Sequence, residues 1–143
     1  QTCALPIFNT RNETALATPV DKVNHLTTLF EENFGSFNLS AASKLLWLSI
    51  RSPIVVYDGR AASALSNCGG YVNVMRNYEN YTNAWRAEYE AAEVAIENAI
   101  KNLPNGRALM PYTQFTEAQL VELAHEPWFK ERVFDIFLWE LGG

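Results

Sequence analysis

The chain has 143 residues and a formal net charge of -5, and hydrophobic residues make up 48% of it. A chain of this length and composition buries enough apolar surface to fold around a core without disulfides or metals, which excludes intrinsic disorder. The 11 basic residues are outnumbered by 16 acidic ones. This balance argues against unspecific binding to nucleic-acid phosphates, which needs clustered Lys and Arg.

The sequence pattern predicts neither a membrane-spanning helix nor a signal peptide. The longest uncharged apolar stretches, residues 45–50 and 53–57, are far shorter than the roughly 20 residues that a spanning helix needs. Residues 1–7 lack the basic region and the apolar run of a signal peptide. Cys3 and Cys68 match no metal-binding spacing and indicate free thiols. We therefore expect a soluble, cytoplasmic protein with no metal site.

The first half of the domain carries clear helix boundaries. Residues 1–17 show no hydrophobic periodicity and are expected to be an irregular arm, followed by one helical domain over residues 18–143. Thr18-Pro19-Val20-Asp21 is typical of a helix start, and Gly35 is expected to cap the end of that helix. A second helix is predicted over residues 41–49, with Ser40 as its N-cap.

An apolar segment, residues 53–57, follows the second helix. Its β-branched residues favour a strand, but no partner strand is visible elsewhere in the sequence. We interpret it as an extended connector that runs through the core. Asp58, directly after it, is a strong N-cap candidate for a third helix over residues 59–66.

Three further helices are predicted in the second half. A long one covers residues 72–102, a short one begins at Thr116, and the last begins at Pro127 and ends at Gly142. The long helix carries aromatic residues at helical spacing, which indicates a core face rather than a ligand platform. The last helix is apolar over a wide arc, and we expect it to pack centrally. The predicted fold class is all-α, a compact single-domain helical bundle.

Two residues stand out as candidates for chemistry. Lys44 lies near the start of the second helix, where the helix dipole disfavours an ammonium and so favours a neutral amine that can attack an electrophilic carbon. Asp58, held ionised by the backbone N–H groups it caps, is suited to act as a base or to stabilise developing positive charge. The structural alternative is a solvated lysine and an aspartate that only caps its helix.

The stretch S-A-A-S-K-L-L-W-L, followed by P-I-V-V-Y-D-G-R-A-A-S-A-L, resembles the helix-hairpin-helix DNA glycosylase superfamily. It is most similar to bacterial proteins described as 8-oxoguanine DNA glycosylase-like. In that superfamily a lysine opens the second helix of the hairpin, and an aspartate caps a later helix across the base pocket. Lys44 and Asp58 match these positions. The final segment, W-F…R-V-F-D-I-F-L-W, also resembles the end of such chains.

The resemblance implies a base-excision glycosylase that handles a flipped nucleotide in double-stranded DNA with a modified base. Lys44 would attack the sugar C1′, or Asp58 would stabilise the sugar cation and activate water. Trp47, Tyr57 and Arg60 are close enough in sequence to line the base pocket. This chemistry requires no cofactor.

A second hypothesis is a non-catalytic binding or assembly module of the same fold, with a protein partner. The superfamily hairpin usually contains L-P-G-x-G, whereas residues 37–41 here are F-N-L-S-A, without glycine or proline. The acidic net charge and the aromatic-rich long helix favour this hypothesis. A third hypothesis is an unrelated helical interaction protein.

Overall fold

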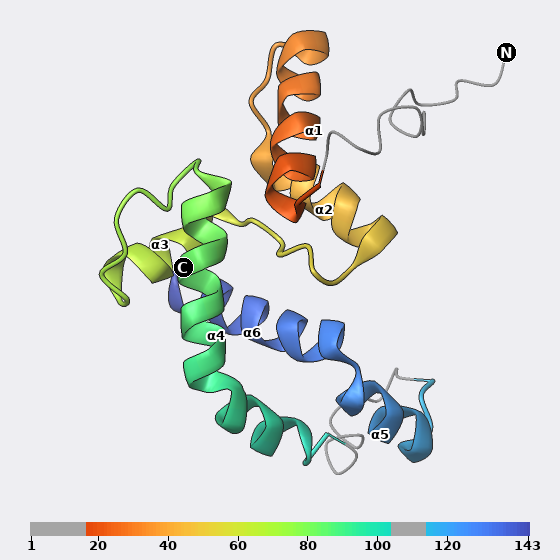
Figure 1. Cartoon of the computed structure of the whole chain (residues 1–143). Helices are drawn as coiled ribbons and strands as arrows, with labels where there is room; N and C mark the ends of the chain where they lie inside the picture. Colours follow the sequence, from red (N-terminus) through yellow and green to blue (C-terminus); the bar gives the residue numbers. More distant parts are fainter. Residues whose placement is uncertain (1–16, 104–113) are drawn as a thin grey trace, which may run out of the picture. The chain divides into compact units, whose positions relative to one another are not determined.

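The computed structural model describes residues 17–103 and 114–143. The expected arm falls almost wholly outside these residues, whereas the predicted end of the long helix at residue 102 lies within them, two residues after the observed end at Ile100. The described residues form an all-α structure with no strand, and Figure 1 shows the arrangement of its helices along the chain. The helices are α1 (Pro19–Phe34), α2 (Leu39–Ile50), α3 (Gly59–Asn67), α4 (Tyr78–Ile100), α5 (Glu117–His125) and α6 (Pro127–Leu141).

The chain divides into two compact units, residues 1–57 and 58–143. In the N-terminal unit α1 and α2 pack against each other. The expected capping box of α1 is present, because Thr18 and Asp21 bond reciprocally to each other's backbone N–H groups. Gly35 ends α1 with a φ of 65°, a left-handed conformation that glycine adopts without steric cost. The buried residues of the two helices are Val23, Leu26, Thr27, Leu39, Ala42 and Ser43.

The start of α2 differs from the prediction. Its N-cap is Asn38, whose side-chain oxygen accepts a hydrogen bond from the backbone N–H of Ala41, 3.0 Å away. The expected cap, Ser40, is already inside the helix. Asn and Ser cap helices about equally well, so the sequence offers two competing starts. The structure uses the earlier one, which buries Leu39.

The connector before Asp58 is extended and buried, as expected. Residues 53–57 form neither helix nor strand, and the side chains from Ile54 to Tyr57 are between 2% and 6% exposed. Four consecutive buried residues are uncommon outside regular structure, because their backbone groups need hydrogen-bond partners that a helix or sheet would supply.

The C-terminal unit is organised around α6, which packs on α3, α4 and α5. The central position expected for the last helix is therefore confirmed. The expected aromatic core face of α4 is also confirmed for Tyr78, Tyr81 and Trp85, which are the largest fully buried side chains of the described residues. The short side chains of α3, among them Ala61, Ala62 and Ala64, allow its close contact with α6.

The predicted start of the long helix at residue 72 is wrong, since α4 begins at Tyr78. Asn73 and Arg76 have φ angles of 55° and 59°, which no α-helix contains. Asn77 then caps α4 through a hydrogen bond to the N–H of Asn80, 2.9 Å away. Val74, within the turn region, is buried, which anchors this non-helical segment.

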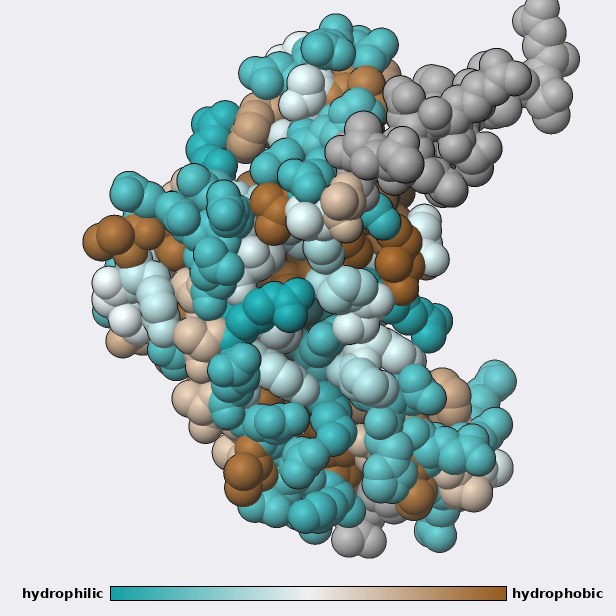
Figure 2. Space-filling view, in the orientation of Figure 1, coloured by the Kyte–Doolittle hydropathy of each residue, from teal (hydrophilic) through white to brown (hydrophobic). Residues whose placement is uncertain are grey.

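None of the helices in residues 17–103 and 114–143 combines the length and the apolar character that crossing a membrane requires. Figure 2 shows a largely hydrophilic face with separate hydrophobic patches. The exposed hydrophobic side chains include Leu48, 70% exposed, and Phe137, 56% exposed.

Candidate functional site

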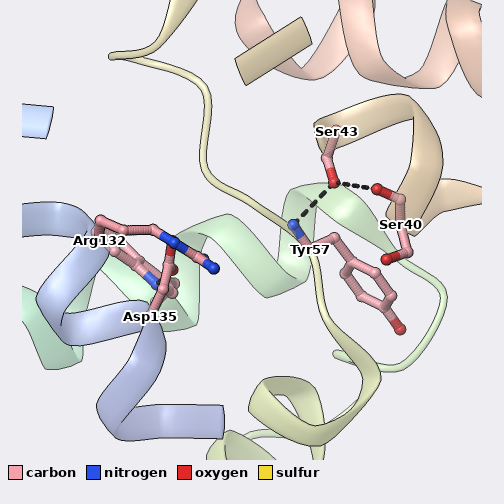
Figure 3. A network of polar contacts seen from close by, with 6 residues as sticks. Ser40, Ser43, Tyr57, Arg132 and Asp135 are labelled. Carbon is pink, nitrogen blue, oxygen red and sulfur yellow. Dashed lines mark hydrogen bonds and ion pairs between the residues drawn. The ribbon is translucent and has the colours of Figure 1, made fainter. Parts of the chain in front are cut away.

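A buried serine ties the connector to α2 in the N-terminal unit. Ser43 is fully buried, and its hydroxyl donates to the carbonyl oxygen of Ser40 at 3.1 Å. The same oxygen accepts a hydrogen bond from the backbone N–H of Tyr57 at 2.9 Å. Figure 3 shows the Ser43 hydroxyl between these two partners. The bond satisfies one of the backbone donors of the buried connector and fixes its last residue to the helix that carries Lys44.

Lys44 follows Ser43 in the second turn of α2 and is exposed. Leu48, one helical turn further along, is exposed as well, so this face of α2 is open to solvent. Trp47, expected to line a base pocket, is half-buried on the same helix. Tyr57, also expected to line that pocket, is buried.

Asp58 is the N-cap of α3, as predicted. Its Oδ1 atom accepts a hydrogen bond from the backbone N–H of Arg60 at 2.9 Å, and the residue is half-buried. Asp58 also makes a second contact through its own backbone: its N–H group donates a hydrogen bond to the phenol oxygen of Tyr81 on α4. The capping bond satisfies one orphan donor of α3.

Arg60 follows in the first turn of α3. Its guanidinium carbon lies 3.6 Å from the centre of the Trp139 ring, which is a close cation–π contact. Within the described part of the chain, its buried Nε atom has no hydrogen-bond partner. Arginine presents five N–H donors in a fixed fork that matches phosphate oxygens. The contact with Trp139 holds the guanidinium on an indole face, and its Nε donor is enclosed by protein atoms.

A buried acidic residue near Asp58 was not predicted from the sequence. Asp135 on α6 is 6% exposed. Its Oδ1 atom accepts a hydrogen bond from the indole N–H of Trp85 at 2.8 Å, and its Oδ2 atom lies 3.3 Å from a guanidinium nitrogen of Arg132. Figure 3 shows Arg132 and Asp135 side by side on α6. Burial raises the pKa of Asp135 to about 7, although Arg132 and Trp85 both oppose the shift.

The sequence contains one signal that points to Asp135. It is the only charged residue between Phe134 and Trp139, in the middle of the most apolar part of the last helix. A charged side chain on an otherwise apolar helix face is almost never fully buried without partners. One partner, Arg132, lies on the same helix, but the other, Trp85, comes from α4, so periodicity alone could not identify it.

A groove of about 420 Å³ lies within the C-terminal unit, between α3, α4 and α6. None of the five residues predicted for the site lines it. Its walls are mostly apolar, with Glu88 as the only charged residue, and they consist of Ala64, Leu65, Cys68, Gly69, Glu88, Ala91, Ala92, Phe134, Phe137, Leu138 and Leu141. Cys68 is an exposed free thiol. The Glu88 carboxylate accepts a hydrogen bond from the Tyr71 hydroxyl at 3.0 Å.

The five predicted site residues are distributed over both units. Lys44, Trp47 and Tyr57 belong to the N-terminal unit, whereas Asp58 and Arg60 belong to the C-terminal one. Within the first unit, Tyr57 is joined by its backbone to the residue before Lys44. Within the second, Asp58 and Arg60 are joined by the capping hydrogen bond.

Comparison with known proteins gives no match. No family model fits the sequence, and no curated protein or solved structure is significantly similar to the chain. The helices of the described residues define the class of the protein as all-α.

Proposed function

We propose that this chain is a DNA base-excision glycosylase-like protein that acts on a flipped nucleobase of double-stranded DNA. Lys44 is the nucleophile, and Asp58 is the stabiliser or base. The observation that carries the proposal is the capping hydrogen bond between the Asp58 carboxylate and the Arg60 N–H. It supports the proposal because the superfamily that the sequence resembles carries an aspartate that caps a helix, and Asp58 matches that position.

The proposed reaction begins when the side-chain nitrogen of Lys44 attacks C1′ of the flipped nucleotide. A carbon–nitrogen bond forms at C1′, the glycosidic bond breaks, and the base leaves with the bonding electron pair and a proton. The Asp58 carboxylate stabilises the positive charge that develops on the sugar. Loss of a proton from the attached nitrogen and opening of the sugar ring then give a Schiff base.

Arg60 supports a role in binding the substrate. Phosphate contacts fix the register of a protein on DNA, and the guanidinium of Arg60, oriented by its contact with the Trp139 ring, is the kind of group that makes them. Trp47, half-buried on α2, offers aromatic surface against which an extruded base can stack, whereas Tyr57 is buried and offers almost none. An enzyme that repairs bacterial genomic DNA works in the cytoplasm, and this location is part of the proposal.

Borohydride trapping tests the nucleophile. The protein is incubated with labelled duplexes that each carry one lesion, such as 8-oxoguanine, uracil, hypoxanthine or an abasic site, and sodium borohydride then reduces the Schiff base to a stable amine. We expect a slowly migrating protein–DNA adduct with the unaltered protein and none with Lys44→Gln. Lys22→Gln, a change on the neighbouring helix α1, is the matched control and keeps the adduct.

Asp58→Asn separates chemistry from helix capping. Asn caps helices about as well as Asp, so the melting temperature should stay unchanged. Loss of the carboxylate should lower the rate of base release roughly a hundredfold or more. Normal turnover by both Lys44→Gln and Asp58→Asn would eliminate this mechanism.

The second candidate is a non-catalytic binding or assembly module. The groove favours it, because the walls are largely apolar and two of the wall residues, Phe137 and Leu141, are 56% and 48% exposed. Fluorescence anisotropy with a duplex that contains an abasic-site analogue distinguishes the two functions. A glycosylase binds this duplex with an affinity that falls as the salt concentration rises. Absence of binding, together with absence of base release on the lesion panel, supports the module.

A further inference from the structure

Tyr81 connects Asp58 to the centre of the C-terminal unit. The side chain is 0% exposed, and its phenol oxygen accepts a hydrogen bond from the Asp58 backbone N–H. Burial raises the pKa of Tyr81 well above its ordinary value, and the carboxylates of Asp135 and Asp58 raise it further. The phenol is therefore neutral at physiological pH, close to both acids.

Asp135 is held in place from the same helix face that carries Tyr81. Trp85 lies four residues after Tyr81 on α4, so the two side chains share one face. The indole N–H of Trp85 donates to Asp135 at 2.8 Å. Trp85 is itself fixed by a stacked contact with Tyr89, with ring centres 5.0 Å apart, and by an edge contact with Phe134 at 5.1 Å. Because the Trp85 ring is fixed in this way, its hydrogen bond also restricts the position of the Asp135 carboxylate.

We propose that Tyr81 is a positioning residue for Asp58, because its buried phenol fixes the backbone at the start of α3 from the core face of α4, and that the charge of Asp135 acts on this attachment. The inference rests on the proposed catalytic role of Asp58. Asp58 ends an extended segment and opens a helix of only nine residues, and such a junction is held by few bonds of its own. Catalytic groups must be kept within about 0.5 Å of their working position, and the buried phenol supplies a fixed attachment point for this one.

The charge of Asp135 is expected to affect the same junction. The charged or titratable groups that act on this cluster are Arg132 and Glu131 from α6, Tyr78 from α4, and Asp58 itself. Of these, Arg132 favours the ionised form of Asp135, and Glu131 disfavours it. Protonation of Asp135 removes a negative charge beside Tyr81. It therefore changes the electrostatic environment of the phenol oxygen that accepts the hydrogen bond from the Asp58 N–H.

Nuclear magnetic resonance tests this coupling without requiring enzymatic activity. In the unaltered protein, the indole N–H resonance of Trp85 should shift with pH as Asp135 ionises, and the amide resonance of Asp58 should shift with the same midpoint. In Tyr81→Phe, the indole resonance of Trp85 should still shift with pH, but the amide resonance of Asp58 should no longer shift with the same midpoint. Amide hydrogen exchange at Asp58 should accelerate at least tenfold in this variant, while exchange in the middle of α4 stays unchanged.

Tyr89→Phe is the matched control, since Tyr89 lies on the same helix and against Trp85. It should leave both the exchange at Asp58 and the common midpoint unchanged. In a base-release assay, Tyr81→Phe should lower kcat at least tenfold with KM within a factor of two. Asp135→Asn keeps an acceptor for the Trp85 indole N–H. It should abolish the pH-dependent shift of the Trp85 indole resonance and flatten the pH profile of kcat.

The two proposals fail in different ways. Unchanged exchange at Asp58 in Tyr81→Phe, or an Asp58 amide midpoint unrelated to that of Trp85, overturns the positioning role even if the protein is an active glycosylase. Absence of base release by the unaltered protein overturns the proposed function, whereas the resonance measurements still decide whether Tyr81 holds Asp58 in place and whether the charge of Asp135 affects it.

Discussion

Gly142 allows the end of α6 to lie directly on the backbone of α3. A Cβ atom at this position would meet the carbonyl oxygen of Arg60 at 1.9 Å and the amide nitrogen of Ala64 at 3.1 Å. Both are backbone atoms and cannot rotate away. Gly142→Ala should therefore lower the free energy of unfolding by about 1–3 kcal/mol, the usual cost of overpacking, as measured by urea denaturation followed by circular dichroism.

Gly59→Ala is the control for this prediction. A Cβ atom at Gly59, in the first turn of α3, would meet nothing within 4 Å. Alanine is also the better helix former, so Gly59→Ala should leave stability unchanged or raise it by roughly 0.5–1 kcal/mol. Equal stability of Gly142→Ala and Gly59→Ala would show that the end of α6 is not held against α3.

Single residues differ in how far the sequence predicts their roles. Asp58 was predicted correctly as a cap because capping depends on the residue and the few that follow it. The hydrogen bond from Tyr57 to Ser43 spans 14 positions, and the bond from Trp85 to Asp135 spans 50. Such hydrogen bonds depend on how distant segments of the chain pack together, and the local hydrophobic pattern of the sequence does not predict this packing.

At the scale of the helix, the start of α2 gives a direct test of capping. Asn38→Ala removes the side chain that accepts the N–H of Ala41, and we expect a loss of about 1 kcal/mol in the free energy of unfolding. Ser40→Ala should cost no more than a few tenths of a kcal/mol, since Ser40 lies within the helix and alanine has the higher helix propensity. Chemical denaturation of both variants measures the difference. A larger loss in the free energy of unfolding for Ser40→Ala than for Asn38→Ala would show that Ser40, and not Asn38, caps α2.

Elements were predicted well where their boundaries carry specific side chains. The capping boxes at Thr18 and Thr116 are both present, and Pro127 opens α6 as expected. The region before α4 was predicted wrongly because its residues do not forbid a helix. Only the backbone conformations of Asn73 and Arg76 break it there, and these follow from tertiary contacts such as the burial of Val74.

At the scale of the whole molecule, Asp135 makes the stability of the C-terminal unit depend on pH. Its carboxyl pKa is about 7 in the folded protein against an ordinary value of 3.8. Between these two values the folded state holds a proton that the unfolded state has released. Stability from this group is therefore complete below about pH 4 and is lost as pH rises toward 7.

Asp135→Asn should remove this pH dependence. The amide oxygen can still accept the bond from Trp85, whereas the buried group no longer has to ionise. Unfolding by urea at pH 5 and pH 8 should show a stability loss in the unaltered protein of at most about 1.4 kcal/mol for each pH unit between 5 and 7, and a clearly smaller loss in the variant. Glu140→Gln, an exposed change on the same helix, should behave like the unaltered protein. The same pH dependence in Asp135→Asn and in the unaltered protein would mean that Asp135 is ionised in the folded state across this range, with Arg132 and Trp85 outweighing the cost of burial.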